Sequence, residues 1–255
     1  MRDIRLQEME KVIRDAGTIS MEDLCRRFDV SMHTVRRDVA ELEKRGAVGK
    51  IYGGVTAIEN SRSLLPNYMD RAVINADQKR ACCAAAAALV RDRDVIFVDS
   101  GTTLSSLPEY LADRQSVTIV THSLTVAQSA FPYDNLDVIM LPGTLRRKTL
   151  SLTGAETVSA LRKYNIRKAF MATTGTTERT VTNSSPNEFE IKQAAVAGIP
   201  ERILVLTCDK FGHAGLMNYA AFSEFQTIVT DRLPPEPWLS ALRESGAELI
   251  SAEEP

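Results

Sequence analysis

The sequence predicts an α/β protein in two parts, a small helical domain followed by a larger, mostly parallel α/β domain. From Ile4 to about Val55 the apolar residues recur at helical spacing, whereas the rest of the chain alternates short apolar runs with helix-prone segments. With 255 residues, the chain is long enough for each part to bury a core. We therefore expect domains over residues 1–57 and 76–255, joined by a connection over residues 58–75.

The spacing of apolar residues predicts three short helices in the N-terminal part. Their inward faces carry Leu6, Met9, Val12 and Ile13 in the first helix, Leu24, Cys25 and Phe28 in the second, and Val35, Val39 and Leu42 in the third. Ser20, followed three residues later by Asp23, is typical of a helix start, and Ser31 is expected to cap the third helix. After Gly46, β-prone pieces separated by glycines predict a small closing hairpin.

Two helices joined by a tight turn, with a capped second helix, form a helix-turn-helix unit, and its second helix reads the major groove of DNA. The residues expected to contact DNA are Ser31, Met32, His33, Thr34, Arg36, Arg37 and Lys44 of the third helix and Lys50 and Tyr52 of the hairpin. An isolated pair of arginines would be better explained as ordinary solvated surface. Three helices, a capped turn and a hairpin placed as a wing together favour DNA binding.

Seven apolar runs mark the strands of the larger domain. They begin at residues 95, 117, 136, 168, 202, 227 and 247. Runs of this length separated by helices predict a Rossmann-like, mostly parallel sheet covered on both faces. Residues 58–75 lack clear periodicity and contain Pro66, which is why we interpret them as the connection.

Polar residues follow several of these runs. The loop DSGTT at residues 99–103 stands between a strand and an expected helix, where backbone N–H groups and hydroxyls can surround an anion. Because parallel sheets bind ligands at the carboxyl ends of their strands, we expect one shared site there. Its candidate residues are Asp99, Ser100, Gly101, Thr102, Thr103, Thr121, His122, Ser123, Gly143, Gly175 and Lys210. For the loop alone, a helix cap without a ligand is at least as well supported.

Composition narrows the remaining possibilities. The formal net charge of −2 gives the whole chain no attraction to polyanions, so any DNA binding must come from local charge. The four cysteines show no CxxC spacing, which predicts neither a metal site nor another cofactor and suits a reduced cytoplasmic protein. Cys82 and Cys83, on an Ala-rich helix, are interpreted as small apolar packing residues. No apolar stretch approaches a membrane span, and the N-terminus is unlike a secretion signal.

The N-terminal part resembles the winged helix-turn-helix of the DeoR family of bacterial sugar-metabolism repressors. The stretch that carries the resemblance is ISMEDLCRRFDVSMHTVRRDVAELEKRGAVGKIYGGV, which matches the family pattern at almost every defined position. Lys50 replaces the usual Arg and Tyr52 the usual His, and both belong to the wing.

The larger domain resembles DeoR-type sensor domains, which are similar to the ribose-phosphate isomerase and CoA-transferase superfamily. It keeps DSGTT, the spacing of Glu188 and Lys192, and KFG at residues 210–212, but departs at His122, Thr144 and residues 207–209. The resemblance implies an effector that is a phosphorylated sugar or sugar alcohol, with its phosphate on the 101–103 loop and its hydroxyls near Glu188 and Lys210. The alternative for Glu188 is a surface i,i+4 ion pair with Lys192.

Two functions remain open at this point. The favoured one is a cytoplasmic transcriptional regulator, a repressor of carbohydrate-utilisation genes and not an enzyme, that binds operator double-stranded DNA as a homo-oligomer (dimer or tetramer) and responds to the phosphorylated sugar. The alternative is a sugar-phosphate isomerase with an accessory helix-turn-helix domain, since Asp99, Glu188 and Lys210 could in principle move a proton next to a carbonyl.

Overall fold

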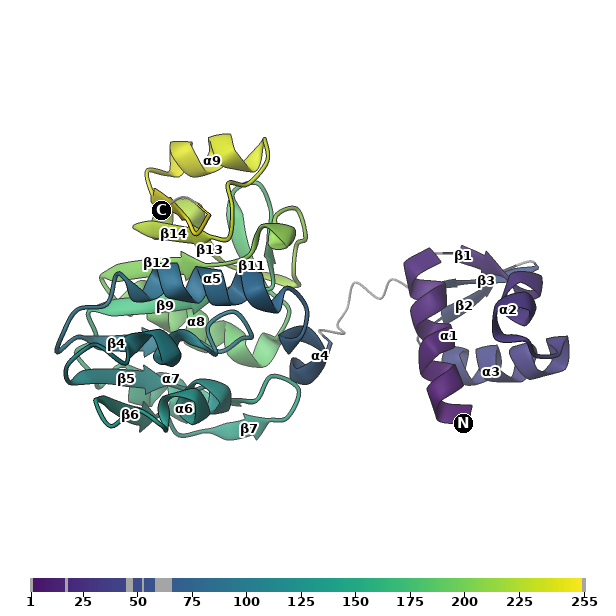
Figure 1. Cartoon of the computed structure of the whole chain (residues 1–255), viewed down its shortest axis with the longest axis horizontal. Coiled ribbons are helices and arrows are strands. Elements are labelled where there is room, and N and C mark those ends of the chain that lie inside the picture. The colour runs from purple at the N-terminus through teal and green to yellow at the C-terminus, as the bar shows by residue number, and fades with distance from the viewer. Residues whose placement is uncertain (1, 17, 45–47, 52, 58–65, 254–255) are drawn as a thin grey trace. The chain divides into compact units, whose positions relative to one another are not determined.

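Two compact units make up the chain, residues 1–62 and residues 63–255. The computed structural model describes residues 2–16, 18–44, 48–51, 53–57 and 66–253 (Figure 1). Each unit has its own hydrophobic core, and each is considered by itself below.

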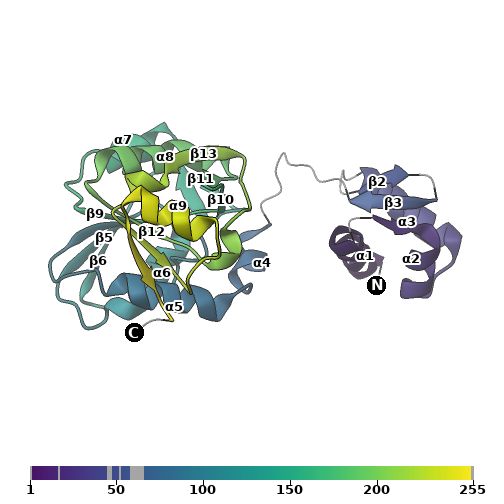
Figure 2. The ribbon, with the colours of Figure 1, turned by 90° about the horizontal axis from the view of Figure 1, so that it is seen from above.

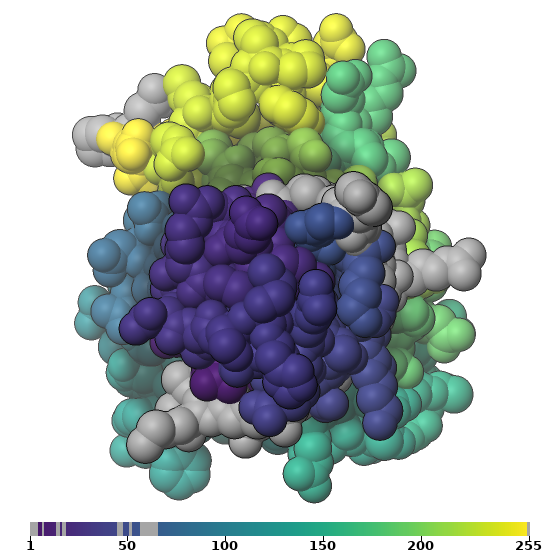
Figure 3. All heavy atoms as spheres, turned by 90° about the vertical axis from the view of Figure 1, so that its right-hand side faces the viewer, coloured from purple at the N-terminus to yellow at the C-terminus, as the bar shows by residue number. Residues whose placement is uncertain are grey.

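The N-terminal unit is a winged helix-turn-helix. Its elements are α1 (Arg2–Ala16), β1 (Thr18–Ser20), α2 (Met21–Phe28), α3 (Met32–Lys44), β2 (Val48–Ile51) and β3 (Gly54–Ala57). The predicted hairpin is β2–β3, and the structure adds β1, which pairs with β3 to give an antiparallel sheet of order β1-β3-β2. The described atoms of this unit form one packed body, drawn in purple and dark blue in Figure 3.

Side-chain caps hold the two helices of the turn in place, as the sequence predicts. The Ser20 hydroxyl accepts a hydrogen bond from the Asp23 backbone N–H at 3.0 Å and so begins α2. Asp29 ends α2 in the left-handed conformation, with φ of 49°. The Ser31 hydroxyl then accepts from the Thr34 backbone N–H at 3.2 Å, which begins α3. The predicted inward residues Leu24, Val35, Val39 and Leu42 are fully buried.

A seven-stranded parallel sheet forms the centre of the C-terminal unit, and the seven predicted runs are its seven strands. The strands are β4 (Val95–Val98), β5 (Val117–Thr121), β6 (Leu136–Met140), β9 (Lys168–Ala172), β12 (Glu201–Val205), β14 (Thr227–Thr230) and β15 (Glu248–Ser251). Their order in the sheet is β15-β14-β12-β9-β4-β5-β6. All six neighbouring pairs are parallel, as expected for strands linked by crossovers.

Helices cover both faces of this sheet (Figure 2). One face packs against α5 (Ala76–Ala87), the 3₁₀ helix η1 (Leu107–Leu111) and α6 (Leu124–Ala130). The other face packs against α7 (Ala155–Leu161), α8 (Pro186–Gly198) and α9 (Trp238–Ser245). Ile96 and Val98 of β4 point into the first core and Phe97 into the second, which is the alternation of a strand buried on both sides.

Short antiparallel strands follow the carboxyl ends of the main strands and were not predicted. They are β7 (Thr144–Arg146) and β8 (Ser151–Thr153), which pair with each other, and β10 (Gly175–Thr176), β11 (Thr180–Asn183) and β13 (Met217–Ala221), which form a three-stranded sheet. Two more 3₁₀ helices, η2 (Cys208–Lys210) and η3 (Phe222–Glu224), complete the unit. These additions bring polar residues to the edge of the sheet where its strands end.

One expectation about local structure was wrong, and one segment contains a helix that was not expected. The DSGTT loop leads into turns and then into η1, not into an α-helix. Hydroxyl side chains there compete for backbone groups, and the Ser105 hydroxyl donates to the Thr102 carbonyl. The expected connection over residues 58–75 also contains a helix, α4 (Tyr68–Ala72), whose Tyr68 is buried against the C-terminal unit.

Buried thiols match the interpretation of Cys82 and Cys83 as packing residues. Both lie on α5 in the core on one face of the sheet, and burial raises the pKa of the Cys83 thiol to about 11. Among the described residues, no helix combines the length and apolar character that a bilayer crossing requires.

Candidate functional site

The outer face of α3 carries exposed cations. Arg36 and Arg37 are both exposed, and 56% of the Arg37 side chain is accessible to solvent. Val35 and Val39, on the opposite face of the same helix, are fully buried in the core of the unit. The two guanidinium groups therefore project from a helix whose orientation the core fixes, as a recognition helix requires.

The other predicted DNA contacts lie on the same helix or beside it. Ser31, His33 and Lys44 are exposed, and Met32 and Thr34 are half-buried. The hydroxyls of Ser31 and Thr34 lie 3.0 Å apart and take part in the cap of the helix. Lys50 on β2 is exposed and forms an ion pair with Glu43 of α3. Tyr52 lies outside the described residues.

Asp38 was not singled out from the sequence, although it anchors α3. It is fully buried, and the Arg5 Nε of α1 donates to its Oδ2 at 2.8 Å. The signal was present, because Asp38 falls three residues after Val35 and four before Leu42, on the apolar stripe itself. A carboxylate on that stripe needs a partner, and an Arg on a neighbouring helix provides it.

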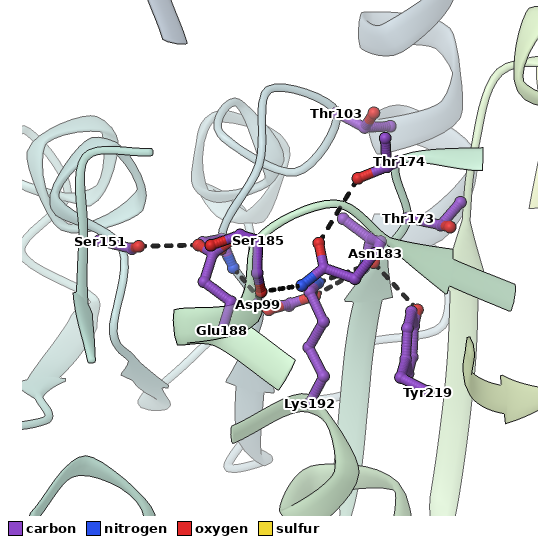
Figure 4. A network of polar contacts seen from close by, with 12 residues as sticks. Asp99, Thr103, Ser151, Thr173, Thr174, Asn183, Ser185, Glu188, Lys192 and Tyr219 are labelled. Atoms are coloured by element: carbon purple, nitrogen blue, oxygen red, sulfur yellow. Dashed lines mark hydrogen bonds and ion pairs between the residues drawn. The ribbon is translucent and has the colours of Figure 1, made fainter. Parts of the chain in front are cut away.

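A buried network around Asp99 lies at the carboxyl end of the sheet (Figure 4). The Asp99 Oδ1 accepts from the Ser100 backbone N–H at 2.8 Å and lies 3.1 Å from the His122 Nε2. The Asp99 Oδ2 accepts from the Ala172 backbone N–H at 3.0 Å and from the Lys192 ammonium. Strands β4, β5 and β9 and helix α8 thus meet at one carboxylate.

The electrostatics of this network keep Asp99 ionised. Burial alone would raise its pKa, but the neighbouring charge of Lys192 and the hydrogen bond and charge of His122 hold the pKa below its ordinary value. The Lys192 Nζ also donates to the Ala172 carbonyl at 2.9 Å. Both oxygens of Asp99 are satisfied by fixed partners, so the network positions the surrounding loops.

Glu188 is buried and faces the 99–103 loop. Its Oε1 accepts hydrogen bonds from the Ser100 hydroxyl at 2.6 Å and from the Ser151 hydroxyl at 2.7 Å (Figure 4). The alternative of a surface ion pair between Glu188 and Lys192 is wrong, since both side chains are buried and the ammonium of Lys192 bonds to Asp99. Because Glu188 and Lys192 are four residues apart on α8, one negative and one positive side chain lie on the same side of this helix, and both line the smaller cavity described below.

Two adjoining cavities open next to this network. The smaller one is polar and is lined by Arg71, Ser100, Gly101, Thr149, Ala172, Thr173, Thr174, Asn183, Glu188 and Lys192. The larger one measures about 420 Å³ and is lined by Pro66, Arg71, Ile74, Lys79, Gly101, Thr102, Thr103, Ala172, Thr173, Thr174, Asp209, Lys210 and His213. Gly101 lies in both, with a φ of +117° that favours glycine.

Three basic side chains surround the larger cavity. The Lys210 Nζ donates to the Thr103 hydroxyl at 2.7 Å, and burial, followed by the charge of Lys79, lowers the pKa of Lys210 to about 8. Lys79 is only 6% exposed, and burial lowers its pKa as well. Burial also lowers the pKa of Arg71. An anion that entered this cavity would meet concentrated positive charge at low dielectric.

The remaining predicted effector residues contribute to the surrounding fold and line neither of these two cavities. Thr121, His122, Ser123, Gly143 and Gly175 are absent from the described linings of both cavities. The Thr121 hydroxyl donates to the Val98 carbonyl, and Ser123 caps α6. A Cβ at Gly143 would lie 2.4 Å from the Thr157 hydroxyl, and one at Gly175 only 1.6 Å from the His213 carbonyl oxygen, so both glycines permit close packing.

Several lining residues were missed by reasoning from sequence. They are Arg71, Lys79, Thr149, Thr173, Thr174 and Asn183. Arg71 fell in the expected connection, and Lys79 lies in the first turn of α5, close along the chain to that segment and not at the end of a strand. Among the described residues, no cluster of His, Cys, Asp or Glu is arranged to hold a metal ion.

An exposed cationic helix in one unit and a cation-lined cavity in a separate α/β unit define a class of protein, the DNA-binding regulator with a ligand-sensing domain. The family model of the DeoR-like helix-turn-helix domain matches residues 5–61, and that of the DeoR C-terminal sensor domain matches residues 74–232. The chain therefore belongs to the DeoR family of transcriptional regulators, as its sequence motifs predict.

Similar proteins from bacteria carry related names. The HTH-type transcriptional regulator IolR of Bacillus subtilis (strain 168) is 40% identical over 233 residues, which cover 91% of this chain and 92% of IolR. The HTH-type transcriptional repressor GlcR of the same organism is 24% identical, with 98% and 96% covered. The lactose phosphotransferase system repressor of Lactococcus lactis subsp. lactis is 27% identical, with 89% and 90% covered.

Solved structures with a related arrangement are more distant. Ribose 5-phosphate isomerase A from Methanocaldococcus jannaschii is 18% identical, with 54% of this chain and 55% of that chain covered and a TM-score of 0.40. The translation initiation factor eIF-2B of Pyrococcus horikoshii OT3 is 13% identical, with 89% and 85% covered and a TM-score of 0.43.

Proposed function

We propose that this protein represses carbohydrate-utilisation genes by binding operator DNA through α3, and that a phosphorylated sugar bound in the C-terminal unit changes that binding. The observation that carries the proposal is the exposure of Arg36 and Arg37 on a capped helix whose other face is core. Arginines at the start of a recognition helix can hydrogen-bond guanine and phosphate. The repressors among the similar proteins support the same role.

The DNA-binding half of the proposal is tested with the duplex upstream of the protein's own gene. Fluorescence anisotropy should give a dissociation constant that rises steeply with salt, because each phosphate contact releases counterions. Replacement of Arg36 and Arg37 by Ala should weaken binding and leave the circular dichroism spectrum unchanged. A wild-type protein that shifts no such duplex at low salt would contradict this half.

The effector half rests on how the two cavities differ. The larger cavity places Thr102, Thr103 and the ammonium of Lys210 around one space, which suits a phosphate. The smaller one offers the Glu188 carboxylate and the Asn183 amide, which suit sugar hydroxyls. Because Gly101 lines both cavities, one ligand can extend from the first into the second.

A thermal-shift screen against phosphorylated sugars and their unphosphorylated forms tests the effector half. A ligand present at about 100 times its dissociation constant should stabilise the folded state by about 2.7 kcal/mol. Lys210→Ala should abolish the response and spare operator binding, while Arg243→Ala, an exposed residue on α9, serves as the control. A panel that leaves the wild type unchanged would count against the sensor.

The state of Asp99 supports binding over catalysis. The isomerase alternative needs a carboxylate free to accept a proton from substrate. Asp99 is fully buried and held by Ser100, Ala172 and Lys192. We therefore propose that the protein is not an enzyme. We expect that the protein does not interconvert ketose and aldose phosphates, even when these sugars saturate its binding site.

We also propose that the regulator acts in the cytoplasm as a homo-oligomer, a dimer or tetramer. Helix-turn-helix proteins read two half-sites about one helical turn apart, which requires two copies of α3. Light scattering coupled to size exclusion should give a mass at least twice that of the 28.1 kDa chain. A monomer at micromolar concentration, with or without DNA, would contradict this part of the proposal.

A further inference from the structure

Helix α4 belongs to neither of the matched family domains. Those domains end at residue 61 and begin at residue 74, so Tyr68–Ala72 falls between them. Arg71 on this helix nevertheless lines both cavities, and Pro66 and Ile74 on either side of the helix line the larger one. The segment that links the DNA-binding unit to the sensor unit thus forms one wall of the effector site.

Within residues 66–253, few interactions fix α4 on the sensor unit. The Tyr68 backbone N–H donates to the Lys148 carbonyl at 3.0 Å, and the Tyr68 ring is 5% exposed. The Lys79 ammonium donates to the Arg71 carbonyl. The other large side chains of the segment face solvent, with Met69 70%, Val73 76% and Ile74 53% exposed. A five-residue helix held at so few points can open locally at little cost.

The Arg71 guanidinium is aimed at the cavities by its own helix. Its Nε donates to the Pro66 carbonyl at 3.0 Å, and its Cζ lies 5.7 Å from the centroid of the Tyr68 ring. It shares the larger cavity with Lys79 and Lys210, so three positive charges converge there. The Asp209 carboxylate lines the same cavity and offsets part of this positive charge. The charge of Arg71 contributes to the lowered pKa of Lys79 and of Lys210, and the charge of Asp209 opposes that shift.

We propose that Arg71 contacts the effector's phosphate directly and that anion binding between Arg71, Lys79 and Lys210 fixes α4 on the sensor unit. The inference rests on the proposed function, in which this cavity takes a phosphorylated effector. An anion between the three cations is attracted to each of them. It also adds a second tie between α4 and α5, beside the hydrogen bond from the Lys79 ammonium to the Arg71 carbonyl. Occupancy of the site therefore sets how firmly the segment leading to the helix-turn-helix unit is held.

Linkage gives the size of the effect. If Arg71 strengthens anion binding by about ten- to a hundredfold, as charged hydrogen bonds commonly do, saturating anion must disfavour the opening of α4 by the same factor. Amide hydrogen exchange reports this opening. The Tyr68 N–H bonds to Lys148 and the Arg71 N–H bonds to the Asn67 carbonyl, so both amides should exchange more slowly when the anion is bound.

The experiment uses the full chain and inorganic phosphate, which probes the cationic cavity without a choice of sugar. Calorimetry gives the phosphate affinity, and hydrogen exchange with mass spectrometry follows peptides over residues 66–75, both at constant ionic strength. The variants are Arg71→Ala, Arg71→Lys, Lys210→Ala and the control Arg80→Ala, an exposed residue on α5 outside both cavity linings. Thermal unfolding without phosphate checks that each variant folds.

We expect phosphate to slow exchange in residues 66–75 of the wild type and of Arg80→Ala about ten- to a hundredfold. Arg71→Ala should bind phosphate about ten- to a hundredfold more weakly and lose this protection, while Arg71→Lys retains part of both. Phosphate binding that needs Lys210, with wild-type affinity in Arg71→Ala and no protection of α4, would overturn the inference and leave the proposed function intact. If the wild type binds no phosphate at all, both fail.

Discussion

The two units of this protein use basic side chains in opposite ways. In the helix-turn-helix unit Arg36 and Arg37 are exposed, whereas in the sensor unit Lys79 and Lys192 are buried. A DNA duplex is a large polyanion that approaches from solvent, so the side chains that contact it must be exposed on the protein surface. A small phosphorylated molecule can be enclosed, and enclosure strengthens every charge interaction because the local dielectric is low.

Burial also imposes a cost that exposure does not. A buried ammonium must have fixed partners, and Lys192 has the Asp99 carboxylate and the Ala172 carbonyl. Lys79 and Lys210 have the Arg71 carbonyl and the Thr103 hydroxyl, which are neutral partners. The difference separates a lysine paired with a carboxylate from two lysines whose hydrogen-bond acceptors are neutral, as expected if those two bind an anion.

The largest expected effect comes from breaking the buried ion pair. Lys192→Met leaves the Asp99 charge without its ammonium partner and should lower the free energy of unfolding of the sensor unit by about 3–5 kcal/mol. Urea unfolding followed by fluorescence measures this, because the single Trp of the chain, Trp238, lies in that unit.

Its control is the exposed ion pair between Arg26 and Asp23 on α2. Arg26→Ala should change the stability of the helix-turn-helix unit by less than about 1 kcal/mol, since exposed pairs contribute little. Circular dichroism measures it, because Trp238 lies in the other unit. If the two variants lose similar stability, the distinction between buried and exposed charges does not hold in this protein.

A smaller effect is expected at the DNA surface. Arg36→Ala and Arg37→Ala should each cost about 1–3 kcal/mol of binding free energy if they contact bases, and each lost phosphate contact should reduce the salt dependence. Anisotropy titrations at several salt concentrations separate the two cases. Arg243→Ala, exposed on the sensor unit, should bind DNA like the wild type.

The pH dependence of anion binding tests the buried basic side chains of the sensor unit. Burial lowers the pKa of Lys210 to about 8, so the free cavity loses this positive charge as the pH rises through that value. If only the charged form binds, the affinity for a phosphorylated sugar should fall about tenfold from pH 7 to pH 9, a range in which a phosphate monoester, with a second pKa of about 6, stays mostly dianionic. Lys210→Arg keeps its charge and should show a weaker dependence. An affinity that rises with pH would refute the assignment.

The smallest effect compares the same cap in the two units. Ser31→Ala removes the cap of α3. Ser123→Ala removes the cap of α6, because the Ser123 hydroxyl accepts a hydrogen bond from the Val126 N–H. Each should cost about 1 kcal/mol in the unit that contains it. Circular dichroism follows both transitions, and fluorescence should detect only the second. A loss of sensor stability in Ser31→Ala would show that the units do not unfold separately.

The parts of the fold that depend on local signals could be predicted from the sequence. Ser20 and Ser31 are helix caps as expected, because capping involves residues only three positions apart. The seven apolar runs became seven parallel strands, because a strand buried on both faces must be apolar throughout. The short antiparallel strands escaped prediction, since their polar, few-residue segments have no clear period.

Only those cavity residues that directly follow a strand could be predicted from the sequence. The DSGTT loop is found by its position after a strand, but Lys192 meets Asp99 across 93 residues and Lys210 meets Thr103 across 107. No local pattern encodes such pairings. Arg71 was missed for a different reason, since its segment lacks clear periodicity and was interpreted as a linker, although its helix is hydrogen-bonded to the Lys148 carbonyl of the sensor unit.

The central claim is that one chain couples an exposed cationic helix to an enclosed anion site. The direct test measures the affinity of the full-length protein for its upstream duplex, with and without each phosphorylated sugar that the thermal-shift screen identifies. Our account predicts that such a sugar changes the wild-type affinity at least fivefold, a typical coupling of about 1 kcal/mol, and leaves Lys210→Ala unaffected. A sugar phosphate that saturates the wild-type site and leaves its DNA affinity unchanged would contradict the account.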